Sequence, residues 1–256
     1  MSSVRNRNNN RGGGRNRNSS NTNNSRNKNN RRNNSNRNNN SDDDDNIIPI
    51  GRRVFCKSNS SAVKLSKQIS MAALPDSIQG FPVRVYAARA DATNVAVKAT
   101  AIATARLANM KQDDDDEAMD LVCIPYFREN RNEVSLHVID LDTIKQSAIF
   151  TTRTSDFNIG AKTDIKTSAG AIAGSARNKE SVVLISIGPV AVFNAIRSVA
   201  VAREYLKGRG DDIDLFVKVQ FTEVRLDDKE EDTTAVKLTC FLHKGLIELD
   251  EDGDDA

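Results

Sequence analysis

The chain repeats one residue pattern at a constant spacing, and this repeat limits its folds more than any other feature. Residues 83–107 read as a short strand-like run, a turn of small residues and a long Ala-rich helix. Residues 182–206 follow the same plan 99 positions later. The aligned pairs include Val83 with Val182, Lys98 with Arg197, and Leu107 with Leu206. A repeat of this length indicates two copies of one module.

The flanking segments extend the repeat to a complete order of elements, βαβαββ, in each copy. Short strand-like pieces and amphipathic helices precede the repeated stretch, and an apolar run and an alternating run follow it. In the first copy these segments are 53–57, 61–73, 119–127 and 133–140, and in the second they are 157–162, 168–178, 213–221 and 234–242. Ser or Thr residues suited to N-caps lead the helices at 61–73 and 168–178.

We therefore predict an α/β fold of the two-layer α+β kind, with tandem modules at residues 50–140 and 156–245. The intervening stretch, about residues 141–155, is interpreted either as a linker or as an extra strand.

Charge is segregated along the chain. Residues 1–41 hold ten Lys/Arg and no acid, so the rest carries 27 Lys/Arg against 35 Asp/Glu. Residues 1–46 have too few apolar side chains to fold, and we predict a disordered Asn/Arg-rich arm. Acidic runs occupy 42–45 and 113–117 and dominate a tail at 246–256. A flexible polycation can hold RNA or DNA by charge alone; the alternative is a low-complexity expansion without a function.

Several classes of protein are disfavoured by composition. Cys56, Cys123 and Cys240 lie far apart with no CxxC spacing, so we expect no metal site, no cofactor and free thiols. Free thiols fit the cytoplasm, with the nucleus as the alternative compartment. No apolar run approaches the roughly 18 residues of a membrane span, so we expect no membrane partner. The basic start lacks the apolar face that an organellar transit peptide needs.

Catalytic patterns are also missing from the sequence. Gly170 and Gly174 suggest a phosphate loop, but they fall inside a helical pattern with no following GK[ST], and we interpret them as sites of close helix packing. His137 and His243 lie in alternating strand patterns, and no nucleophile has a recognisable activated setting. We expect a binding protein rather than an enzyme.

Several stretches resemble a known family. Residues 161–177 and 191–203, and more distantly 94–103 and 120–127, resemble the stage V sporulation protein S family, which belongs with the Alba-like proteins. Residues 88–97 also resemble the strand-to-helix turn of Alba, where a basic residue takes the position of Arg89. The resemblance implies a βαβαββ fold, side-by-side pairing of two modules, and binding of nucleic acid.

The two copies differ at the turn that carries this resemblance. Gly188 and Pro189 replace Arg89 and Ala90 in the second copy, and Phe193 replaces Asn94. The copies therefore need not bind a ligand in the same way.

Basic residues are the candidate ligand contacts, because phosphate attracts Lys and Arg. By analogy with Alba, Lys57, Arg89 and Lys162 face the ligand; the alternative is that they are ordinary solvated residues. Lys98 and Arg197, at matching places in the long helices, either bind phosphate or border a module interface and pair with an acid.

The sequence thus predicts a tandem Alba-like protein that binds nucleic acid, RNA slightly favoured over DNA, with the modules paired within one chain. The alternative is an interaction module that assembles through its Ala-rich helices, as a homo-oligomer or with a protein partner. A folded body without strong positive charge and without aromatic platforms for bases favours that alternative.

Overall fold

A computed structural model describes residues 47–48, 52–73, 82–109, 119–226 and 231–249. These residues belong to one compact unit, residues 43–256. The predicted basic arm at 1–46, the acidic run at 113–117 and most of the acidic tail lie outside the described residues.

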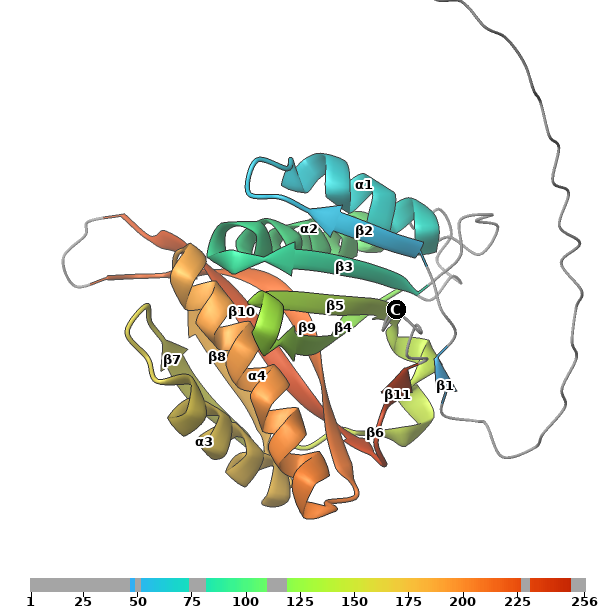
Figure 1. The fold of residues 1–256 in the computed structure, drawn as a ribbon, viewed down its shortest axis with the longest axis vertical. Helices are drawn as coiled ribbons and strands as arrows, with labels where there is room; N and C mark the ends of the chain where they lie inside the picture. The colour runs from blue at the N-terminus through green and yellow to red at the C-terminus, as the bar shows by residue number, and fades with distance from the viewer. Residues whose placement is uncertain (1–46, 49–51, 74–81, 110–118, 227–230, 250–256) are drawn as a thin grey trace, which may run out of the picture. The chain divides into compact units, whose positions relative to one another are not determined.

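The described elements follow the predicted order in both halves of the unit, and the expected α/β class is confirmed (Figure 1). The first half contains β2 (Arg52–Cys56), α1 (Ala62–Ala73), β3 (Val83–Ala88), α2 (Arg89–Asn109), β4 (Leu121–Arg128) and β5 (Glu133–Asp140). The second half contains β7 (Thr154–Ile159), α3 (Ile165–Arg177), β8 (Ser181–Ser186), α4 (Pro189–Arg209), β9 (Ile213–Val224) and β10 (Thr233–Lys244).

The stretch between the halves is both a linker and a short strand. It forms two 3-10 turns, η2 (Leu141–Thr143) and η3 (Lys145–Ser147), and then β6 (Ala148–Ile149), which pairs with β10. A separate two-stranded pairing joins β1 (Ile47–Ile48) to β11 (Glu248–Leu249).

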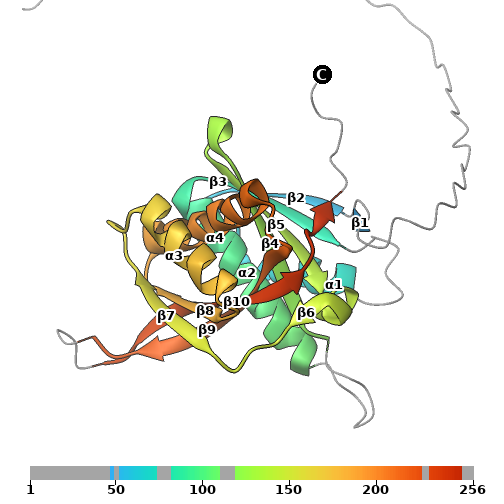
Figure 2. The same cartoon turned by 90° about the horizontal axis from the view of Figure 1, so that it is seen from below.

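Within the described residues, one sheet runs through both halves in the order β2-β3-β5-β4-β9-β10-β8-β7, with β6 added at β10. In each half the outer two strands are parallel, and the other neighbours are antiparallel. The halves meet where β4 pairs with β9 (Figure 2). Outward from this joint, the order β4-β5-β3-β2 in the first half therefore matches the order β9-β10-β8-β7 in the second half.

The register shows the same correspondence residue by residue. A row of directly paired residues crosses the sheet through Val83, Val138, Cys123, Val217, Cys240 and Val182. All six side chains are buried. Directly opposed residues in a ladder share one face of the sheet, so this row forms the floor of a core that spans both halves.

Helices α2 and α4 pack against each other over this floor. Their Ala content allows that approach: Ala96 and Ala103 of α2, and their aligned partners Ala195 and Ala202 of α4, are fully buried. The cysteines are free and buried, as expected, and burial raises the pKa of Cys123 to about 12, which leaves an unreactive thiol.

Two local predictions about the helix at 165–177 are wrong. Its N-cap is Asp164, whose carboxylate accepts from the Thr167 backbone N–H at 2.8 Å, and not a Ser or Thr. A Cβ at Gly170 or Gly174 would meet nothing within 4 Å, so neither glycine marks a close helix contact. The helix packs through Ala169, Ile172 and Ala176 instead. Helix α1 keeps its predicted Ser61 cap.

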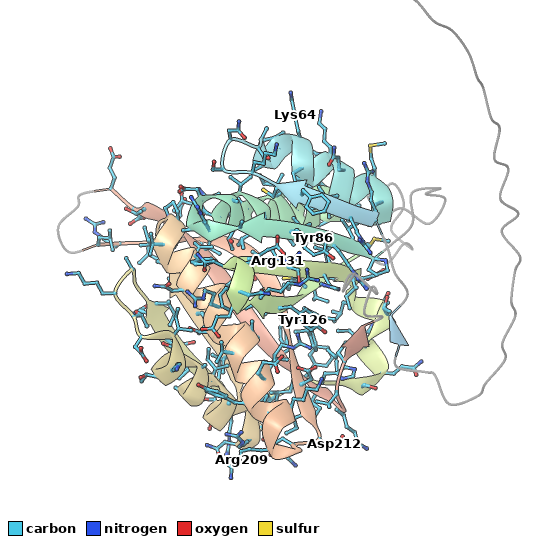
Figure 3. All side chains as sticks on the ribbon, viewed as in Figure 1. Lys64, Tyr86, Tyr126, Arg131, Arg209 and Asp212 are labelled. Atoms are coloured by element: carbon cyan, nitrogen blue, oxygen red, sulfur yellow. The ribbon has the colours of Figure 1, made fainter. Side chains whose placement is uncertain are left out.

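The opposite face of the sheet carries a smaller apolar cluster near the joint. It contains Val122, Ile124, Ile139, Ile144, Phe216 and Ile247. Tyr126 of β4 borders this cluster, and Figure 3 labels it together with Tyr86 of β3. No helix among the described residues is long and apolar enough to cross a membrane.

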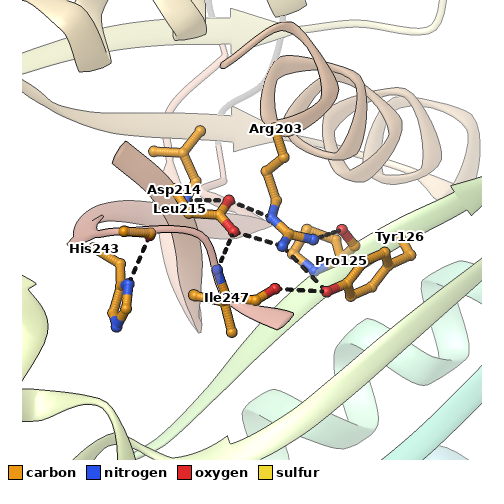
Figure 4. A network of polar contacts seen from close by, with 8 residues as sticks. Pro125, Tyr126, Arg203, Asp214, Leu215, His243 and Ile247 are labelled. Carbon is orange, nitrogen blue, oxygen red and sulfur yellow. Dashed lines mark hydrogen bonds and ion pairs between the residues drawn. The ribbon is translucent and has the colours of Figure 1, made fainter. Parts of the chain in front are cut away.

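A buried ion pair within the second half also contacts the first half at the joint (Figure 4). Arg203 of α4 binds Asp214 of β9 through two bonds of 2.7 and 2.8 Å. The same guanidinium donates to the Pro125 carbonyl at 2.9 Å and to the Tyr126 hydroxyl at 3.2 Å, both on β4. Asp214 also accepts from the Ile247 N–H at 2.9 Å. Burial alone would lower the pKa of Arg203, but Asp214 and Tyr126 outweigh it and raise that pKa.

We expect Arg203→Met to lower the free energy of unfolding by about 3–5 kcal/mol, because it leaves the Asp214 carboxylate buried without its counter-ion. Asp120→Asn, which removes the more exposed pair between Asp120 and Lys218 across the same joint, should cost under about 1 kcal/mol. Urea unfolding of both variants measures this. Equal losses would contradict the role given to Arg203.

Candidate nucleic-acid interface

Lys57 and Arg89 come from neighbouring strands and lie at the same end of the sheet. Strands β2 and β3 are parallel, with Cys56 opposite Ala87. Lys57 directly follows β2, and Arg89 directly follows β3. Both side chains are exposed. The carboxyl ends of two parallel strands thus present two cations next to each other, as phosphate contact requires.

The turn into α2 has an unusual backbone. Arg89 has a φ of 68°, in the left-handed region that non-glycine residues rarely occupy. Gly188, the residue aligned with it, has a φ of 87° before α4. The Arg89 N–H donates to the Asn132 carbonyl at 3.1 Å, which ties this turn to the hairpin between β4 and β5. Both halves therefore require a positive φ here, and only the second supplies the glycine suited to it.

Lys162 lies apart from that pair in the strand order. It is exposed in the turn after β7, three residues beyond Ile159, rather than at the strand end. Strands β2 and β7 are at opposite ends of the sheet's strand order. Asn194 of α4 holds this turn through bonds of 3.2 Å to the carbonyls of Gly160 and Ala161. The strand order groups Lys57 with Arg89 and not with Lys162.

Lys98 and Arg197 have different surroundings despite their matching positions. Lys98 is exposed, whereas Arg197 is half-buried with its guanidinium 4.1 Å from the Phe127 ring centroid and 5.2 Å from that of Phe193. Phe127 belongs to β4, so Arg197 reaches across to the first half. Burial lowers the pKa of Arg197, and the charge of Glu129 partly opposes this shift. Arg197 thus packs against aromatic rings at the joint between the halves.

Aromatic side chains gather on the helix-free face of the first half, contrary to the expectation from the sequence. One row across four strands contains Phe55, Tyr86, Ser135 and Tyr126. The Phe55 and Tyr86 rings are stacked, with centroids 5.2 Å apart and an angle of 21° between their planes. Phe55 is 69% exposed. The sequence signal was alternation: Arg53 and Phe55 are two positions apart in β2 and share a strand face.

Basic residues surround these rings. The Arg128 guanidinium lies 5.6 Å from the Tyr86 centroid and 3.9 Å from the Glu133 carboxylate. His137, in the next row, packs 4.9 Å from Tyr126. Burial lowers the pKa of His137 to about 3, and the charges of Arg84, Arg203 and Arg128 contribute further. The lowered pKa means that His137 is neutral in the folded protein at neutral pH.

The second half lacks the rings of Phe55 and Tyr86 at the aligned positions. The register aligns Phe55 with Asn158 and Tyr86 with Ile185, which pair with each other in β7 and β8. Asp156 occupies the place of Arg53. The described residues also contain no group of His, Cys, Asp or Glu that could hold a metal ion.

Comparison with known protein families matches residues 155–243 to Stage V sporulation protein S (SpoVS). The match covers nearly all of the second half, from the second residue of β7 to the penultimate residue of β10. It supports membership of the SpoVS family for this module.

We expect His137 to make the protein less stable in mild acid. Its pKa is about 3 in the folded state and near the ordinary value of 6.5 in the unfolded chain, so between these values the unfolded state binds the extra proton. Stability is therefore complete above pH 6.5 and falls as the pH drops, by up to about 1.4 kcal/mol per pH unit.

Urea unfolding of the wild type and His137→Phe between pH 7.5 and 4 isolates this contribution as the difference between the two curves. A difference that does not change with pH would show that the pKa of His137 is the same in the folded and unfolded states, which contradicts this account.

Proposed function

We propose that this chain binds nucleic acid through two Alba-like modules that pair within one polypeptide, with RNA favoured over DNA. The role is binding rather than catalysis, with no cofactor. The fold supports the pairing: the shared strand order and the row centred on Cys123 and Val217 relate the halves as two copies of one module. The family match supports one of these copies directly.

The observation that carries the binding proposal is the backbone of Arg89. A non-glycine residue at positive φ costs on the order of 1 kcal/mol, and such residues are frequent at functional sites. The Arg89 side chain is exposed, so it offers no core packing in return. An exposed cation in a position that suits glycine is best explained by a ligand for its side chain, and Lys57 supplies a second cation beside it.

The alternative proposal is an assembly module that binds another protein. Helices α2 and α4 already pack against each other, so their Ala-rich contact faces are used within the chain. Assembly would need another surface, such as the exposed Val63 and Met71 of α1.

We expect Arg89→Gly and Lys57→Ala each to weaken RNA binding and to make the slope of log K against log salt shallower by about 0.7–0.9. Lys166→Ala, an exposed lysine on α3, is the matched control and should leave both unchanged. Arg89→Gly should also raise the free energy of unfolding by several tenths of a kcal/mol, because glycine relieves the strain.

The measurement uses the full chain in a background where the ten Lys/Arg of residues 1–41 are Gln, so that the arm's charge does not mask the body. Labelled single-stranded RNA and duplex DNA are titrated over a salt series. Binding that disappears in this background would assign nucleic acid to the arm alone and favour the assembly alternative.

A further inference from the structure

We propose that the helix-free sheet face of the first half binds the unpaired bases of single-stranded nucleic acid, with one base stacked on Phe55. This inference rests on the proposed function and specifies it: Lys57 and Arg89 contact phosphates at the strand ends, and the aromatic row contacts bases. We call the surface formed by Phe55, Tyr86, Lys57 and Arg128 the Phe55 platform.

The geometry of the Phe55 platform suits stacking. Tyr86 is nearly buried and lies against one face of the Phe55 ring at 5.2 Å, which fixes the ring's orientation. Phe55 itself is 69% exposed, so much of its ring is open to solvent. A large apolar ring held in this way on an outer strand is ready to receive a second planar group. Stacking of one base on an aromatic side chain contributes about 1–3 kcal/mol.

The charges of the platform select the ligand. Lys57 is exposed and directly follows β2, two residues beyond Phe55 in the chain. Arg128 extends from β4 toward Tyr86 and is 41% exposed, while its acidic neighbour Glu133 is 17% exposed. Arg128 therefore presents part of its guanidinium to solvent beside the Tyr86 ring while it is paired with Glu133. Aromatic rings bordered by cations match a polyanion whose bases are unpaired, because a duplex keeps its base faces stacked inside.

The platform occurs once in the described part of the chain. Asn158 and Ile185 occupy the places of Phe55 and Tyr86 in the second half. The paired modules are therefore unequal, and we expect one base-stacking site per chain, in the half that also carries Arg89.

The test compares Phe55→Ala with Phe150→Ala, a matched loss of an exposed phenylalanine (58% exposed) outside the platform. Both are made in the full chain with the arm's basic residues replaced by Gln. The probes are oligo(U) RNA, oligo(dT) DNA, a duplex of the same length, and inorganic polyphosphate. We expect Phe55→Ala to weaken binding to both single strands about tenfold. Binding to duplex and polyphosphate and the salt slope should remain unchanged, and Phe150→Ala should bind every probe as the unmutated background does.

A second variant tests the stacking itself. The chain contains no Trp, so Phe55→Trp introduces a single indole on the platform. We expect oligo(U) and oligo(dT) to quench its fluorescence, and polyphosphate to leave it unchanged.

The outcomes separate this inference from the proposed function. If Phe55→Ala binds single strands as the wild type does while Arg89→Gly and Lys57→Ala bind weakly, the proposed function stands and the platform is overturned. If the arm-neutralised chain binds none of the probes, both fail. If Phe55→Ala changes the sedimentation of the free protein instead of its affinity, the platform is a contact between copies of the chain, and the inference is overturned.

Discussion

The pairing of β4 with β9 makes one sheet out of two sets of strands, and the rest of the structure depends on it. At this joint Cys123 lies opposite Val217, and the Cys123 thiol also lies 3.5 Å from the Val217 carbonyl. A short contact of this kind has few ladder bonds, so the bonds from Arg203 to Pro125 and Tyr126 of β4 and the packing of α2 on α4 supply further contacts between the halves. The ion pair with Asp214 holds the Arg203 guanidinium in place for these bonds.

The two halves share one core at the joint, whereas the residues on their exposed surfaces differ. The buried row from Val83 to Val182 is nearly the same on both sides of the joint, with only apolar side chains and cysteines. The exposed positions diverge: Arg89 against Gly188, and Phe55 against Asn158. Fold and pairing depend on the shared interior, whereas the proposed binding depends on exposed positions of the first half. Under the proposed function, two halves with the same strand order therefore have unequal roles.

The sequence predicted the element order well, because alternation and helical periodicity report burial directly, and burial determines this core. The N-cap of α3 was harder to predict. The sequence pattern placed the start of this helix at residue 168, whereas it begins at Ile165 and is capped by Asp164. The Gly170 and Gly174 prediction failed because spacing alone does not say which helix face meets a neighbour. Lys57 and Arg89 were identified as neighbours of a turn, but Phe55 was missed, since only the strand pairing shows that it stacks on Tyr86. The positive φ of Arg89 likewise has no signal in one sequence except its alignment with Gly188.

The most direct test of the central claim is to map the contact itself. The full chain bound to single-stranded RNA is cross-linked by ultraviolet light, and the modified peptides are identified by mass spectrometry. The account predicts cross-links in residues 52–57 and 83–89, with none at the corresponding residues 155–160 and 182–188 of the second half. Cross-links found only within residues 1–41, or equally in both halves, would contradict it.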